Sequence, residues 1–120
     1  MEKLTIKNNL KRDTSFGNHI LGDVTLLKDI TNTMKNVVVE VNIKNIKIEE
    51  YDGYAIVSLM LKDTTGKISA KIIKKGNKSE IADFVSKINL KKRYRISGII
   101  TFDDVFENKL AMIVQNVEQI

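Results

Sequence analysis

Polar side chains, most of them lysines, recur at every second position in one apolar stretch of the chain. Lys67, Ser69 and Lys71 alternate there with isoleucine and alanine. Because successive side chains of a β-strand point to opposite faces, these polar groups would share the solvent-exposed face of a strand. Ammonium groups in a row attract phosphates and release their counterions. We therefore expect a polyanion-binding surface that contains Lys62, Lys67, Ser69, Lys71 and Lys74.

Aromatic side chains flank the turns on either side of this stretch. Tyr51 and Tyr54 border an Asp-Gly turn, and Phe102 and Phe106 border a later one. Flat rings stack on the bases of single strands, so we expect Tyr51, Tyr54 and Phe106 to take part in binding. Phe102 continues the apolar face of its own segment, and we expect it in the core. Both turns also carry carboxylates, which would repel phosphates at close range.

Residue types suited to catalysis are scarce. The single histidine, His19, lies in a polar segment without a recognisable partner, and we interpret it as a solvated residue. The carboxylates at residues 49–52 and 103–107 could hold a metal ion only if their loops converged. The turn that begins at Asp63 lacks the glycine-rich run and lysine of a phosphate loop, so its carboxylate is expected to bind nearby amides. We expect this chain alone to be no enzyme and to hold no cofactor.

Positive charge is concentrated in one segment. The chain of 120 residues has a net charge of +5, but residues 67–95 hold 10 basic and 2 acidic side chains, a net of +8. Residues 96–120 hold 1 and 4, a net of −3. Such asymmetry favours a polyanionic partner. The alternative is a solvated, lysine-rich surface without a ligand.

Absent residue types set further limits. The chain has no cysteine, which excludes disulfides and thiolate metal sites. It has no apolar run of about 18 residues, so we expect no membrane partner. The first residues lack the apolar region of a signal peptide. We expect a cytoplasmic protein.

Alternating apolar residues predict five strands. The first slips by one residue at Lys44-Asn45, which predicts a β-bulge, and Asp52-Gly53 predicts a hairpin turn. In the second and third strands, the alternation directs Met60 and Ile73 outward with the lysines. The predicted strands span residues 36–50, 54–62, 67–74, 93–102 and 109–120.

A helix is predicted between the third and fourth strands. Asn77 and Glu80 form a capping-box pattern, and the apolar residues of 81–88 share one face, ending near Asn89. That face would pack on an open end of the sheet. The order β-β-β-α-β-β is that of an all-β, five-stranded OB-fold barrel with one helix. An SH3-like barrel is the alternative, which the helix disfavours.

The chain is expected to divide near residue 36. Residues 1–35 would form a linker or docking arm, in which residues 25–34 have the spacing of a short helix, and residues 36–120 would form the OB-fold domain. A second basic group follows the predicted helix, where it could face away from the lysines of the third strand. It comprises Lys87, Lys91, Lys92, Arg93 and Arg95.

Four patterns and one preceding segment carry a resemblance to a known family. They are Asn36-Val-Val-Val-Glu-Val, Leu61-x-Asp63-x-x-Gly66-x-Ile68-x-Ala70-x-Ile72, Leu90-Lys-Lys-x-Tyr94-x-Ile96-x-Gly98, Leu110-x-Met112-x-Val114-x-x-Val117-x-x-Ile120 and Ser15-Phe-Gly-Asn-His-Ile-Leu-Gly22. Residues 36–120 resemble the OB domain of PolC-type DNA polymerase III α subunits of low-GC Gram-positive bacteria. The last of these segments resembles the linker before that domain.

The resemblance implies a fragment of a replicative DNA-directed DNA polymerase with 3'-5' exonuclease activity. Its catalytic carboxylates would lie outside this chain. What it implies here is weak, salt-dependent binding of single-stranded DNA, with other polymerase domains or replisome proteins as further partners. Two alternatives stay open. One is a protein-interaction module that docks through Met60, Ile73 and Phe106, and the other is an OB protein for a small ligand or tRNA.

Overall fold

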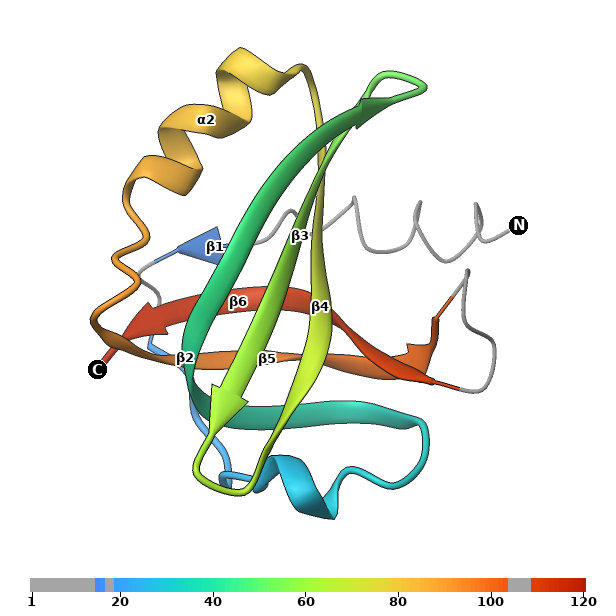
Figure 1. The fold of residues 1–120 in the computed structure, drawn as a ribbon, viewed down its shortest axis with the longest axis vertical. Coiled ribbons are helices and arrows are strands. Elements are labelled where there is room, and N and C mark those ends of the chain that lie inside the picture. Colours follow the sequence, from blue (N-terminus) through green and yellow to red (C-terminus); the bar gives the residue numbers. More distant parts are fainter. Residues whose placement is uncertain (1–14, 17–18, 104–108) are drawn as a thin grey trace.

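The computed structural model describes residues 15–16, 19–103 and 109–120 of the chain. Five long strands and one α-helix make up most of this part (Figure 1). Their bounds are β2 (Met34–Tyr51), β3 (Tyr54–Asp63), β4 (Gly66–Lys75), α2 (Lys78–Ser86), β5 (Arg93–Phe102) and β6 (Leu110–Gln119). The expected mostly-β class with one helix is confirmed. The short strand β1 (Ser15–Phe16) was not predicted, and the 3-10 turn η1 (Leu27–Asp29) lies within residues 25–34, where a short helix was expected.

The long strands close into a ring because β2 is shared between two partners. Residues 34–42 of β2 pair with β5, and residues 42–51 pair with β3. The sheet order β6-β4-β3-β2-β5 then closes where β5 pairs with β6. The register shifts between Lys44 and Lys47, and Asn45 has a φ of 52°. Asparagine tolerates this left-handed conformation better than most residues, and the predicted bulge is confirmed.

The β2–β3 hairpin has the turn that its sequence predicts. Asp52 and Gly53 have φ values of 53° and 82°. Two successive positive φ angles define the type I′ turn, whose twist matches that of the two strands. Tyr51 and Tyr54 therefore become directly opposed partners at the tip of the hairpin.

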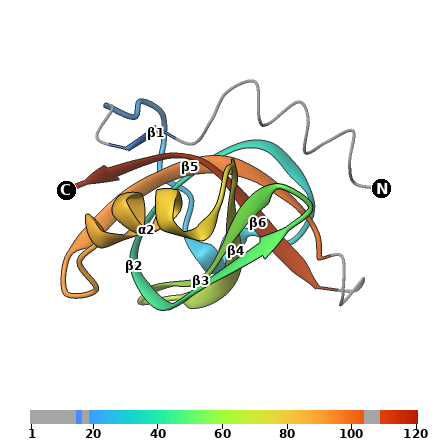
Figure 2. The ribbon, with the colours of Figure 1, turned by 90° about the horizontal axis from the view of Figure 1, so that it is seen from above.

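Helix α2 lies across one opening of the ring (Figure 2). Ile81 and Ile88 are buried in the same core as the strands, as the helical spacing predicts. The α-helix ends at Ser86, earlier than expected, and the side chain of Glu80 in the predicted capping box lies outside the described residues. Among the described residues, no helix is long and apolar enough to cross a membrane.

Residues 19–20 are fastened to the ring by a charged network. The carboxylate of Glu118 accepts a hydrogen bond from the amide of Ile20 and contacts Nδ1 of His19, each at 3.0 Å. Arg95 pairs with Glu40 at 2.7 Å and lies 3.9 Å from Glu118. The amide of Ile20 and the His19 ring hold the pKa of Glu118 below its ordinary value. The interpretation of His19 as a residue without a partner was wrong, although its side chain stays 70% exposed.

The carboxylate of Asp63 joins the β3–β4 turn to η1. It accepts hydrogen bonds from the Thr65 amide at 2.7 Å, the Thr65 hydroxyl at 2.6 Å and the Gly66 amide at 3.0 Å. Its second oxygen accepts one from the Leu27 amide at 2.9 Å. Burial alone would raise the pKa of Asp63, but these hydrogen bonds outweigh it and lower the pKa. The expected role as a turn residue that binds amides is confirmed.

Asp63→Asn should make the free energy of unfolding of the protein depend less on pH in the acidic range. The folded-state pKa lies below the unfolded value of about 3.9, so the carboxylate stabilises the fold above the unfolded pKa. That contribution is lost as the pH falls through the folded-state pKa. At neutral pH the free energy of unfolding of the variant, measured by urea unfolding, should be about 1–3 kcal/mol lower than that of the wild type. An Asp83→Asn variant on the surface of α2 is the control. Parallel pH profiles for wild type and Asp63→Asn would contradict this account.

Gly98→Ala should destabilise the ring. Gly98 lies at the register shift between β5 and β6, and a Cβ there would stand 2.1 Å from the carbonyl oxygen of Ile113. Relieving that overlap should cost about 2 kcal/mol or more in urea unfolding. Gly66→Ala is the matched control, because its Cβ would meet nothing closer than 3.9 Å. It should change stability by less than about 0.5 kcal/mol. Equal losses in the two variants would disprove the steric explanation.

Candidate nucleic-acid interface

The register of β2, β3 and β4 arranges their outward side chains in rows, because directly paired residues share one face of a sheet. Three neighbouring rows contain five lysines: Lys44, Lys47, Lys62, Lys67 and Lys71. We call the nine residues of these rows the lysine face. They are Asn42–Lys62–Lys67, Lys44–Met60–Ser69 and Lys47–Ser58–Lys71.

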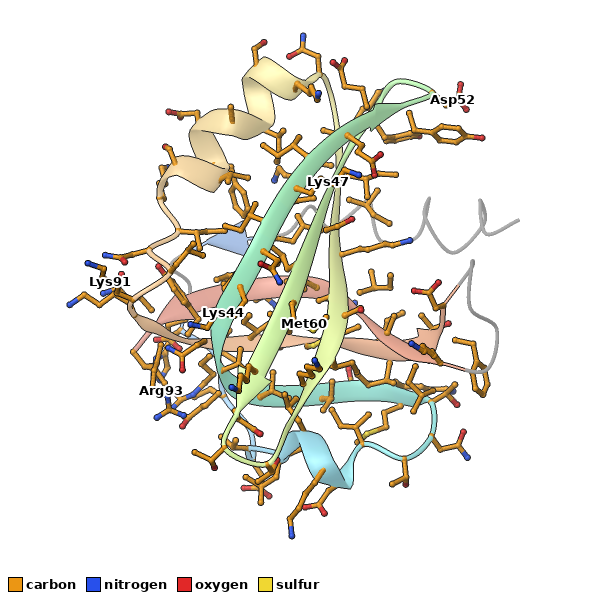
Figure 3. All side chains as sticks on the ribbon, viewed as in Figure 1. Lys44, Lys47, Asp52, Met60, Lys91 and Arg93 are labelled. Carbon is orange, nitrogen blue, oxygen red and sulfur yellow. The ribbon has the colours of Figure 1, made fainter. Side chains whose placement is uncertain are left out.

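Lys44 and Lys47 belong to this surface although the sequence did not single them out. Both are exposed, like Lys62 and Lys67, and they lie along β2 beside Met60 of β3 (Figure 3). Lys44 already faces outward in the alternation before the bulge, and the bulge resets that alternation so that Lys47 faces outward as well. The predicted slip at Lys44-Asn45 was the signal that could have revealed them. The ammonium nitrogen of Lys47 also lies 3.8 Å from a carboxylate oxygen of Glu49. Such an exposed ion pair contributes little to the stability of the fold.

Lys74, expected among the binding lysines, lies on the other face of β4. It pairs with Ala55, which is buried inside the ring. Its ammonium nitrogen stands 5.0 Å from the centroid of the Phe84 ring, a cation–π contact with α2. Lys74 continues the inward series of Ala70 and Ile72, and only its position near the end of the ring lets the amine reach the helix. The structure therefore separates Lys74 from Lys62, Lys67, Ser69 and Lys71.

The two tyrosines lie at the far end of the same outer surface. Tyr51 is 65% exposed, and Tyr54 is half-buried beside it. One row without lysine, Glu49–Ile56–Ile73, separates them from the lysine face. Ile73 was expected to be exposed there, but it keeps only 9% of its surface because it is packed beside Ile56 rather than open to water. The docking patch predicted from Met60, Ile73 and Phe106 therefore lacks one of its expected exposed residues, Ile73.

The aromatic residues of the last turn divide between the described and undescribed parts of the chain. Phe102 was expected in the core, but it is 49% exposed. It ends β5, paired with Leu110, beyond the last inward residue that the ring encloses. Phe106 lies outside the described residues.

The second basic group does not act as one unit. The guanidinium of Arg95 donates twice to Glu40, at 2.7 and 3.0 Å, so its charge is already compensated. Arg93 is exposed and pairs with Asn42, which places it at the margin of the lysine face. Figure 3 shows Arg93 and Lys91 beside the bend of β2.

The lysine face offers cations, hydroxyl groups and a thioether, which suits binding rather than acid–base chemistry. Within the described ranges, no group of three histidine, cysteine, aspartate or glutamate side chains is placed to hold a metal ion. Part of the second acidic turn, residues 104–108, lies outside those ranges.

No protein-family model and no curated protein matches this sequence. The chain is similar in fold to a solved structure of RecG bound to a three-way DNA junction, with a TM-score of 0.60. The two are 13% identical, and the match covers 82% of this chain but only 12% of RecG. At that identity the likeness shows a common fold alone.

Proposed function

We propose that this chain is an OB-like module that binds single-stranded nucleic acid through the lysine face. The observation that carries the proposal is the set of five lysines, from three adjacent strands, in register on one outer surface. The structural likeness to RecG supports it, because that protein was solved with DNA.

In this proposal the lysines contact successive phosphates, and bases lie over Met60 and the two serines of the same face. Tyr51 and Tyr54 add stacking surfaces at the hairpin end. Binding is weak, because the lysine face itself contains no ring and Glu49 stands between it and the tyrosines. No metal or other cofactor takes part.

We also propose that the chain is a segment of a PolC-type polymerase, in which it helps to guide the template during replication in the cytoplasm. This rests on the sequence resemblance of residues 36–120 and the preceding Ser15–Gly22 segment. The polymerase and exonuclease chemistry would belong to the larger protein. Reading the gene beyond Ile120 tests this origin: an exonuclease domain is expected, and a different domain would contradict it.

A protein-docking module is the second candidate, and exposed apolar residues before β2 favour it. Leu21 is 78% exposed, with Val24 and Leu26 also open to solvent. These residues could contact another polymerase domain or a replisome protein. On that account, loss of lysines would change oligonucleotide binding only in proportion to total charge.

The double variant Lys62→Gln/Lys67→Gln should bind a thymidine strand of about twelve nucleotides more weakly and with less salt dependence. Each phosphate contact of a single strand contributes about −0.7 to the slope of log K against log salt concentration. Losing two contacts should therefore reduce the size of the slope by about 1.4. Fluorescence anisotropy titrations at several salt concentrations measure both quantities.

Two further double variants serve as a second test of the lysine face and as a control outside it. Lys44→Gln/Lys47→Gln removes the same charge from the β2 side of the lysine face and should have a similar effect. Lys78→Gln/Lys87→Gln removes it from the α2 region and should leave the slope nearly unchanged. If all three lower binding equally, binding follows total charge and the lysine face is not the interface.

A further inference from the structure

An open hollow of about 440 Å³ adjoins the lysine face where η1, β4 and β6 meet. Its apolar lining comes from four places in the chain: Leu27 and Ile30 before β2, Met60 on β3, Ile68 on β4 and Leu110 at the start of β6. Its volume lies within the range of sites that hold small organic groups. Met60 belongs both to this hollow and to the lysine face, so the two surfaces are continuous.

The wall formed by η1 is held in place by the β3–β4 turn. The Leu27 amide donates to Asp63 at 2.9 Å, and the Lys28 amide donates to the Thr65 hydroxyl at 3.1 Å. Leu27 is itself buried in the core. The hollow is therefore bounded by anchored backbone on the side of η1.

The rim of the hollow is basic. Lys67 and Lys109 both line it, and among residues 15–16, 19–103 and 109–120 no aspartate or glutamate does. Strands β4 and β6 are parallel, with Ser69 paired to Ala111, so the same register extended by two residues brings Lys67 beside Lys109. The exposed hydroxyl of Ser69 adds a hydrogen-bonding group at the mouth.

We propose that this hollow receives one unstacked base of the bound strand, while Lys67 and Lys109 contact the phosphates on either side. This inference rests on the proposed function and adds a subsite to it. The apolar walls accept the faces of a base, and Ser69 can bond with its polar edge. The two ammonium groups fit the charge of the flanking phosphates, which the apolar side chain of a docked protein would not supply.

The test compares a thymidine strand of about twelve nucleotides with an abasic strand that has the same number of phosphates. Affinities of the full chain are measured by fluorescence anisotropy at one low salt concentration. Wild type should prefer the thymidine strand by at least about fivefold, the lower end of what one bound base contributes. Ser69→Leu, which fills the mouth of the hollow, should lower this ratio by the share that the hollow contributes and leave the affinity for the abasic strand unchanged.

Ser86→Leu is the matched control, because it makes the same replacement at an exposed serine of α2 that neither belongs to the lysine face nor lines the hollow. It should keep the wild-type ratio, and thermal unfolding should show both variants folded. Equal affinity of wild type for the two strands would overturn the base subsite and leave the lysine face as a phosphate-binding surface. Equal loss of the ratio in the two leucine variants would also overturn it. Failure of the wild-type protein to bind either strand would reject the proposed function as well.

Discussion

Strand β2 can pair with β5 along one half and with β3 along the other because its backbone bends at Asn45. This bend closes the ring, since β5 can then return to β6. It also sets the phase of the outward side chains beyond it, which places Lys47 on the same face as Lys44 and the lysines of β3 and β4. In a β2 without the bulge, Lys47 would share the inward face of Val41 and Ile43. The shape of the core and the charge of the proposed interface thus depend on one local irregularity.

The two faces of the ring distribute charge in different ways. On β5 and β6, Arg95 is compensated by Glu40 and Glu118, and this network also fastens His19 and Ile20. On β2, β3 and β4, the lysine face holds five lysines and no carboxylate, and Glu49 follows in the next row. Compensated charge fixes structure, whereas uncompensated charge of one sign attracts a partner of the other sign. This contrast is the physical basis for assigning the interface to the lysine face.

Much of the fold could be predicted from period and turn chemistry, but the side-chain positions at the strand ends could not. Asp52-Gly53, the bulge and the apolar face of α2 all follow local rules, and each is confirmed. Phe102 was misplaced because a period of two says which face a residue shares, not where the ring stops enclosing it. Lys74 was misplaced although the same period puts it on the face of Ala70 and Ile72. Lys44 and Lys47 were missed because the slip at Lys44-Asn45 indicates only a change of face. Which lysines come together is decided by pairing across strands, which no local pattern contains. The contacts of His19 and Leu27 join residues 99 and 36 positions apart along the chain, so local sequence gave no sign of them.

The most direct test of the central claim is an NMR titration of the full chain with a short thymidine strand at low salt. The account predicts that the amide signals of the lysine face shift together, above all those of Lys44, Met60, Lys62 and Ser69. Signals of α2 and of the network around Glu118 should change little. Shifts confined to residues 87–95, or no shifts on β2, β3 and β4, would contradict it.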